Sequence, residues 1–131
     1  MGKKIGLGAL LLVAVFSAGF VPEYFKRSAA ESQLKESERK NREAEIRDLA
    51  SMAYVQASQK NYGMAAQTCG QFFSRLQPLS AERASTTGAQ TFDEILGYRD
   101  KVTAALAKGD PAVLNDLQAV YLKTRAATLG Q

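Results

Sequence analysis

From Ile46 onward, apolar residues recur at intervals of three and four, the spacing that places them on one face of a helix. A first narrow stripe consists of Ile46, Leu49, Ala53 and Ala57, with Met52 and Val55 beside it. A second, clearer stripe consists of Tyr62, Ala65, Ala66, Cys69, Phe72, Phe73 and Leu76. Asn61 is suited to cap the second helix, and Pro78 to end it. The pattern therefore predicts an antiparallel helical hairpin over 46–78.

A second hairpin is predicted after a loop over 78–90, which is rich in Ser, Thr, Ala and Gly. Thr91 and Glu94 have the spacing of a capping box at the start of a helix. Gly109 is suited to end that helix, and Asp110 to cap the last one. The apolar positions of these two helices are Phe92, Ile95, Leu96, Val102, Leu106, Val113, Leu114, Leu117, Val120 and Tyr121. No segment alternates like a half-buried strand, so the sequence predicts an all-α fold.

Residues 26–45 are dominated by charged and small polar residues, and opposite charges recur at helical spacing with the acid first. The pairs are Glu31 with Lys35, Glu36 with Lys40, Glu38 with Arg42, and Glu43 with Arg47. Such pairs each stabilise a helix by about 0.2–0.5 kcal/mol. A coiled coil would need apolar residues every three to four positions, and these are missing. We therefore expect a solvated helical spacer in this segment.

The N-terminus begins with Lys3 and Lys4, followed by an uncharged, mostly apolar run over 5–21. As a helix this run covers roughly 25 Å, slightly less than a bilayer core, and Tyr24 and Phe25 can extend it at the headgroup level. The sequence therefore predicts a single transmembrane helix over 1–25. The lysines favour a cytoplasmic N-terminus, with the body in the periplasm or otherwise outside the cytoplasm.

The predicted domains are thus an anchor over 1–25, a spacer over 26–45 and a helical-hairpin domain over 46–131. Within the anchor, Gly6, Ala14 and Ala18 are small residues suited to close packing against another membrane helix. The alternative to a retained anchor is a cleaved secretory signal. Its site would be Ser17-Ala18-Gly19, which is mediocre because bulky residues follow at once.

Composition excludes several classes of function. The net charge of +4 is spread along the chain, with no basic run interleaved with aromatic residues, so we expect no nucleic-acid partner. The chain has no histidine, which removes the commonest general base and metal ligand. Its single cysteine, Cys69, falls on an apolar helical face, although it could pair with a second copy in a homo-oligomer. We predict no enzyme activity, no cofactor and no metal.

The first hairpin resembles a tetratricopeptide repeat. Leu49, Met52 and Ala53 match the family's pattern in the first helix, and Asn61-Tyr62 matches its turn. In the second helix the matching residues are Ala65, Cys69 and Phe72, and Pro78 lies at the repeat's end. Gln56 and Phe72 depart from it, since an aromatic residue and alanine are usual there. The resemblance implies binding of other proteins; a small four-helix bundle is the alternative architecture for the two hairpins.

Two hairpins bury little apolar surface, so some aromatic residues are candidates for a partner surface. The candidates are Phe72, Phe73, Tyr98 and Tyr121. We therefore expect a non-catalytic, single-pass accessory or scaffold subunit that contacts the lipid bilayer and the subunits of a larger membrane protein complex. The alternatives are a membrane-tethered periplasmic adaptor, or chaperone-like module, for soluble clients, and a secreted helical protein if the apolar run is removed.

Overall fold

The computed structural model describes the backbone of residues 2–84 and 89–129, and the side chains of residues 23–84 and 89–129. The described chain is helical throughout, with short turns between the helices, as the all-α prediction requires. The helices are α1 (Gly2–Ser58), α2 (Tyr62–Arg83), α3 (Ala89–Leu96), α4 (Arg99–Ala107) and α5 (Val113–Leu129). The chain divides into two compact units, one up to Arg39 and one from Lys40 onward.

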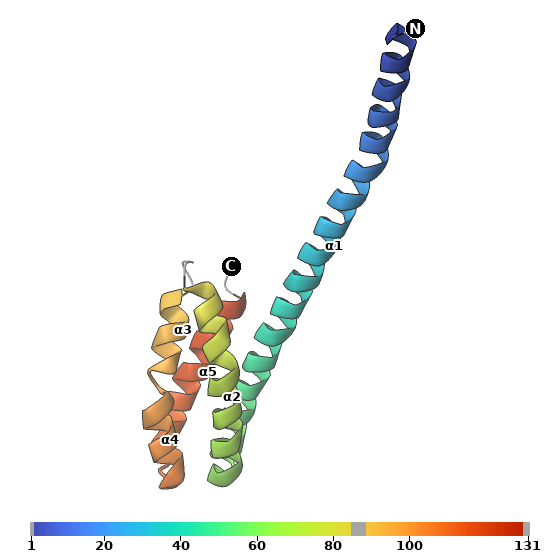
Figure 1. The fold of residues 1–131 in the computed structure, drawn as a ribbon. Helices are drawn as coiled ribbons and strands as arrows, with labels where there is room; N and C mark the ends of the chain where they lie inside the picture. The colour runs from blue at the N-terminus through green and yellow to red at the C-terminus, as the bar shows by residue number, and fades with distance from the viewer. Residues whose placement is uncertain (1, 85–88, 130–131) are drawn as a thin grey trace. The chain divides into compact units, whose positions relative to one another are not determined.

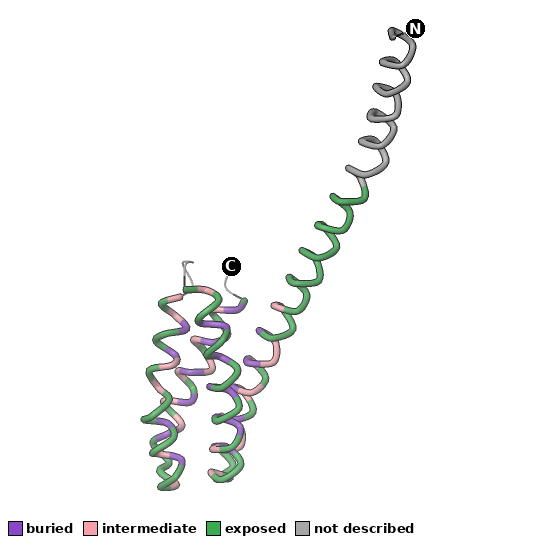
Figure 2. The backbone as a smooth tube through the Cα atoms, in the orientation of Figure 1, coloured by how far each residue is buried: buried purple, intermediate pink, exposed green. Residues whose placement is uncertain are grey.

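The predicted fold class is wrong in its transmembrane helix. Within the part of the chain that the structure describes, no helix combines the length and the apolar character needed to cross a membrane. The described stretch of α1 from Glu23 to Glu38 is exposed (Figure 2), and in the sequence charged residues recur along it. The apolar run over 5–21, with Gly6, Ala14 and Ala18, lies outside the residues whose side chains are described.

The second unit is a helical bundle rather than two separate hairpins. Residues 40–58 of α1, then α2, then the α3–α4 pair, then α5 run in alternating directions (Figure 1). Its largest fully buried side chains come mainly from α2 to α5, namely Phe72, Leu76, Phe92, Ile95, Val102, Val113, Leu117 and Thr124, with Ile46 from α1. Apart from Thr124, these residues belong to one continuous hydrophobic core.

The predicted end of the second helix at Pro78 is wrong, because α2 continues to Arg83 with Pro78 inside it. Proline removes a backbone donor, so the Ser74 carbonyl loses its helical partner, but this part of the helix is exposed to water. Leu79 and Ser80, which follow, are buried. Packing of these residues against the core outweighs the local cost of proline, and the predicted loop is correspondingly shorter.

The capping box at Thr91 is also wrong, since α3 already begins at Ala89 and Thr91 lies inside it. Glu94 forms an ion pair with Lys123 of α5 at 2.8 Å. The predicted helix after it is divided into α3 and α4 at Gly97, where a Cβ atom would lie 3.2 Å from the Glu94 carbonyl oxygen. The break separates two short helices that both contribute core residues.

Two turns have the same hydrogen-bond pattern. After α1, the Lys60 amide donates to Ala57 and the Asn61 amide to Gln56; after α4, the Gly109 amide donates to Leu106 and the Asp110 amide to Ala105. This is the Schellman motif, in which one residue is left-handed. That residue is Lys60 in one turn (φ 62°) and Gly109 in the other (φ 64°).

The residue after each turn caps the next helix. The Asn61 side chain accepts a hydrogen bond from the Met64 amide at 3.4 Å, and the Asp110 side chain accepts one from the Ala112 amide at 2.9 Å. The predicted caps at Asn61 and Asp110 and the predicted turn at Gly109 are therefore confirmed.

Candidate partner-binding surface

Two of the four aromatic residues predicted for a partner surface lie in the core instead. Phe72 and Phe73 of α2 are buried, and their rings pack edge to face with centroids 5.0 Å apart. They are unavailable to a partner because α2 turns the face that carries them towards the other helices of the bundle. Tyr98 and Tyr121 are partly buried and pack against the same core. All four of these aromatic residues therefore pack in or against the hydrophobic core.

The apolar side chains that do reach the surface of the second unit include a group on α1 and α2. Met52 and Val55 lie in the last two turns of α1, and Met64 lies in the first turn of α2. Their exposed fractions are 50%, 45% and 47%. We call these three residues the hairpin patch. Leu122 and Leu129 of α5 are exposed as well.

Met52 and Val55 of the hairpin patch face outward because alanine occupies most of the inner face of α1. The buried apolar positions there are Ile46, Ala50, Ala53 and Ala57. Leu49, which the sequence placed in the buried stripe, is only partly buried. With the helix rotated in this way, Met52 and Val55 point to solvent. Sequence reasoning missed the patch because a buried stripe through Leu49 and one through Ala50 both have helical spacing.

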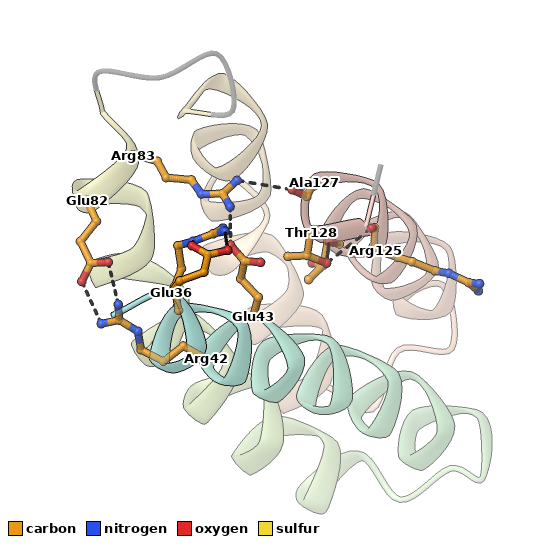
Figure 3. Close-up of polar contacts among 10 residues, drawn as sticks. Glu36, Arg42, Glu43, Glu82, Arg83, Arg125, Ala127 and Thr128 are labelled. Carbon is orange, nitrogen blue, oxygen red and sulfur yellow. Dashed lines mark hydrogen bonds and ion pairs between the residues drawn. The ribbon is translucent and has the colours of Figure 1, made fainter. Parts of the chain in front are cut away.

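Farther from the turn between them, α1 and α2 are joined by polar contacts. Arg42 of α1 forms a two-pronged ion pair with Glu82 of α2, with N–O distances of 2.9 and 3.0 Å, rather than pairing with Glu38 (Figure 3). Glu45 of α1 pairs with Arg75 of α2 at 3.1 Å. The intrahelical spacing of the charges does not reveal these pairs, because both partners are 30 or more residues apart in the sequence.

Arg83 connects several helices at one end of the bundle. It donates to the Glu43 carboxylate of α1 and, at 3.4 Å, to the Ala127 carbonyl of α5 (Figure 3). Its guanidinium carbon also lies 5.1 Å from the centroid of the Phe92 ring of α3. Arg83 thereby links α2 to α1, α3 and α5, which is a structural role.

A shallow cavity of about 420 Å³ lies between α4 and α5. Its walls include Ala104, Ala105 and Val113, and its charged rim includes Lys101 and Asp116. These two are paired with each other at 2.7 Å, and this hydrogen bond raises the pKa of Lys101. Lys108 and Asp110 also line the cavity, so its lining carries two bases and two acids in all.

Chemically reactive groups are few in the described residues. Burial raises the pKa of the Cys69 thiol to about 12, which keeps it protonated and unreactive at neutral pH. In residues 23–84 and 89–129, no three Cys, Asp or Glu side chains gather where they could hold a metal ion. In the same residues, every buried side-chain nitrogen and oxygen atom has a hydrogen-bond partner.

Comparisons of the chain with family models, with curated proteins and with solved structures find no match. The resemblance to tetratricopeptide repeats and the membrane localisation therefore stay predictions from the sequence.

Proposed function

We propose that this chain is a non-catalytic accessory or scaffold protein that binds partner proteins through the hairpin patch. The observation that carries the proposal is the exposure of three large apolar side chains, Met52, Val55 and Met64, close in sequence to the turn between α1 and α2. Methionine adapts its shape to irregular apolar surfaces and is common at binding surfaces. The polar residues around the patch, such as Gln59 and Asn61, would form the wet rim that such interfaces have.

The resemblance of this hairpin to a tetratricopeptide repeat supports the same conclusion, since that family binds other proteins. The composition supports it too, because the chain lacks histidine and its only thiol is buried. A stable partner would cover the exposed methionines, which is favourable at about 25 cal/mol per Å² of apolar surface removed from water.

The test is co-purification with the tagged full-length chain, followed by mass spectrometry of the bound proteins. We expect a fixed set of partners in constant ratio, lost when Met52→Lys and Met64→Lys are combined. Leu122→Lys is the matched control, because Leu122 is 52% exposed but lies on α5. Circular dichroism must show unchanged helicity in both variants.

Retention of the partner set by the double variant would contradict the proposal. Many soluble clients bound in small and variable amounts would instead favour the adaptor or chaperone-like alternative. A methionine-containing surface is also compatible with that broader specificity.

A further inference from the structure

The segment of α1 over 40–58 adds little apolar volume to the bundle. Its buried apolar residues are Ile46, Ala50, Ala53 and Ala57, of which only Ile46 is large. The other helices supply the remaining large core residues, including the phenylalanines and most of the leucines. Because hydrophobic stabilisation grows with the apolar area removed from water, this segment is the least firmly held part of the core.

Polar contacts to α2 specify where the segment lies. Besides the Arg83–Glu43 pair, they are Arg42–Glu82, Glu45–Arg75 and the hydrogen bond from the Thr68 hydroxyl to the Gln56 amide oxygen at 2.8 Å. The charges of the two helices are complementary, because Arg42 of α1 pairs with an acid of α2 and Glu45 of α1 pairs with a base of α2. Two of these ion pairs are exposed to water, which competes with them.

The hinge to this segment is short and strained. Only residues 59–61 separate α1 from α2, and Lys60 has a φ of 62°. This left-handed conformation is unfavourable for a residue with a side chain. Opening the turn relieves that strain, and short strained hinges favour exchange of an element between identical chains.

We propose that residues 40–58 of α1 exchange between two copies of this chain, so that each copy's α2 pairs with the other copy's α1. The occupant is a second copy because its α1 carries the matching charges in the matching order. The exchange reuses contacts present in a single chain and requires no new surface. The contacts that are exchanged involve no side chain of the hairpin patch, of which Met52 and Val55 lie on the outer face of the segment and Met64 lies on α2. This inference is therefore independent of the proposed function.

Complementary charge variants test the exchange. One variant carries Arg42→Glu and Glu45→Arg in α1, and the other carries Glu82→Arg and Arg75→Glu in α2. Within one chain of either variant, and between two identical chains, positions 42 and 82 carry the same charge, and so do positions 45 and 75. In a mixed exchanged dimer every one of these pairs is again of opposite charge.

Native mass spectrometry of the two full-length variants, co-expressed with different tags, then measures the dimers. We expect the mixed dimer to exceed either homodimer by roughly tenfold or more, given the usual weight of exposed ion pairs. Combining all four substitutions in one chain restores the pairs internally, so this control shows that the reversed charges allow folding. If the control folds and the mixture yields no mixed dimer, the proposal is overturned, whether or not each variant folds alone.

The hinge supplies the second measurement. Lys60→Gly removes the strain from the closed turn in both copies, and should lower the mixed dimer by roughly tenfold. A mixed dimer that forms but does not respond to this substitution would be held by another surface, and would also overturn the exchange.

Discussion

Arg83, near the end of α2, donates to the carboxylate of Glu43 in α1, and the two side chains are only 13% and 6% exposed. Removing one partner of so buried a pair leaves the other charge in a poorly solvated position. We expect Arg83→Met to lower the free energy of unfolding by about 3 kcal/mol, since it also loses the contacts to Ala127 and Phe92.

Urea unfolding followed by circular dichroism measures this loss. Glu43→Gln should cost less, because an amide can still accept the hydrogen bond from Arg83. Arg42→Met is the matched control, since its pair with Glu82 is about half exposed and is worth at most about 1 kcal/mol. Equal losses for the Arg83 and Arg42 variants would show that the buried pair has no special weight.

The two equivalent turns predict opposite effects of glycine. Lys60→Gly should raise the free energy of unfolding by about 0.5–1 kcal/mol, because glycine adopts a φ of 62° without strain. Gly109→Ala should lower it by about 1 kcal/mol for the same reason. The Cβ atom would lie 3.5 Å from the Tyr62 ring, an ordinary contact, so steric overlap adds nothing.

Thermal unfolding of both variants, at equal protein concentration, shows whether Lys60→Gly stabilises the protein and Gly109→Ala destabilises it. A destabilising Lys60→Gly would mean that the lysine side chain makes a stabilising contact that outweighs its backbone strain.

Pro78 leads to a third prediction. It is exposed inside α2, where proline costs about 3 kcal/mol relative to alanine, partly offset by the stiffer unfolded chain. We therefore expect Pro78→Ala to raise the free energy of unfolding by about 1–2 kcal/mol, measured by urea titration. Gln77→Ala, at the neighbouring exposed position, is the control and should have little effect. A loss of stability in Pro78→Ala would indicate that the packing of α2 depends on a bend at this residue.

The sequence predicted the all-α fold, the turn at Gly109 and the caps at Asn61 and Asp110, because each depends on local backbone geometry. It failed at Pro78, where burial of Leu79 outweighs the local preference of proline. Such a balance depends on contacts with distant helices, which spacing alone does not reveal. The same limit explains why the pairs of Arg42 and Arg83 with residues about 40 positions away were not foreseen.

The candidate surface was predicted less well than the fold. Helical spacing identified the face of α2 that carries Phe72 and Phe73, but not that the other helices cover it. In α1, a stripe through Leu49 and one through Ala50 fit the spacing equally well. Only the packing of the bundle decides between them. Because it buries Ala50, Met52 is exposed.

The next prediction concerns Gly70 and does not depend on contacts with other helices. Gly70 lies in the middle of α2 on the exposed face, and an added Cβ atom would meet nothing within 4 Å. Gly70→Ala should therefore raise the free energy of unfolding by about 0.8–1 kcal/mol. Thermal unfolding measures the gain, with Gln67→Ala as a control on the same face. A destabilised Gly70→Ala variant would contradict the prediction and would show that the added methyl group is not accommodated at this position.

The raised pKa of Cys69 makes stability depend on alkaline pH. The thiol ionises near pH 9 in the unfolded chain but only near pH 12 in the folded protein, so the folded state binds more protons between these values. Stability therefore falls as pH rises above about 9. Between pH 7.5 and 10 the loss from this group is about 1.4 kcal/mol.

Cys69→Ala removes this dependence, and urea unfolding at pH 7.5 and pH 10 measures the difference between the variant and the unaltered chain. The comparison stops at pH 10 because Lys101 and Lys123, whose pKa values are raised by Asp116 and Glu94, lose their stabilising charge only at higher pH. Each ion pair is present in both proteins, so its contribution to stability cancels when the two are compared. An equal loss of stability in both proteins would show that the Cys69 thiol ionises as readily in the folded chain as in the unfolded one.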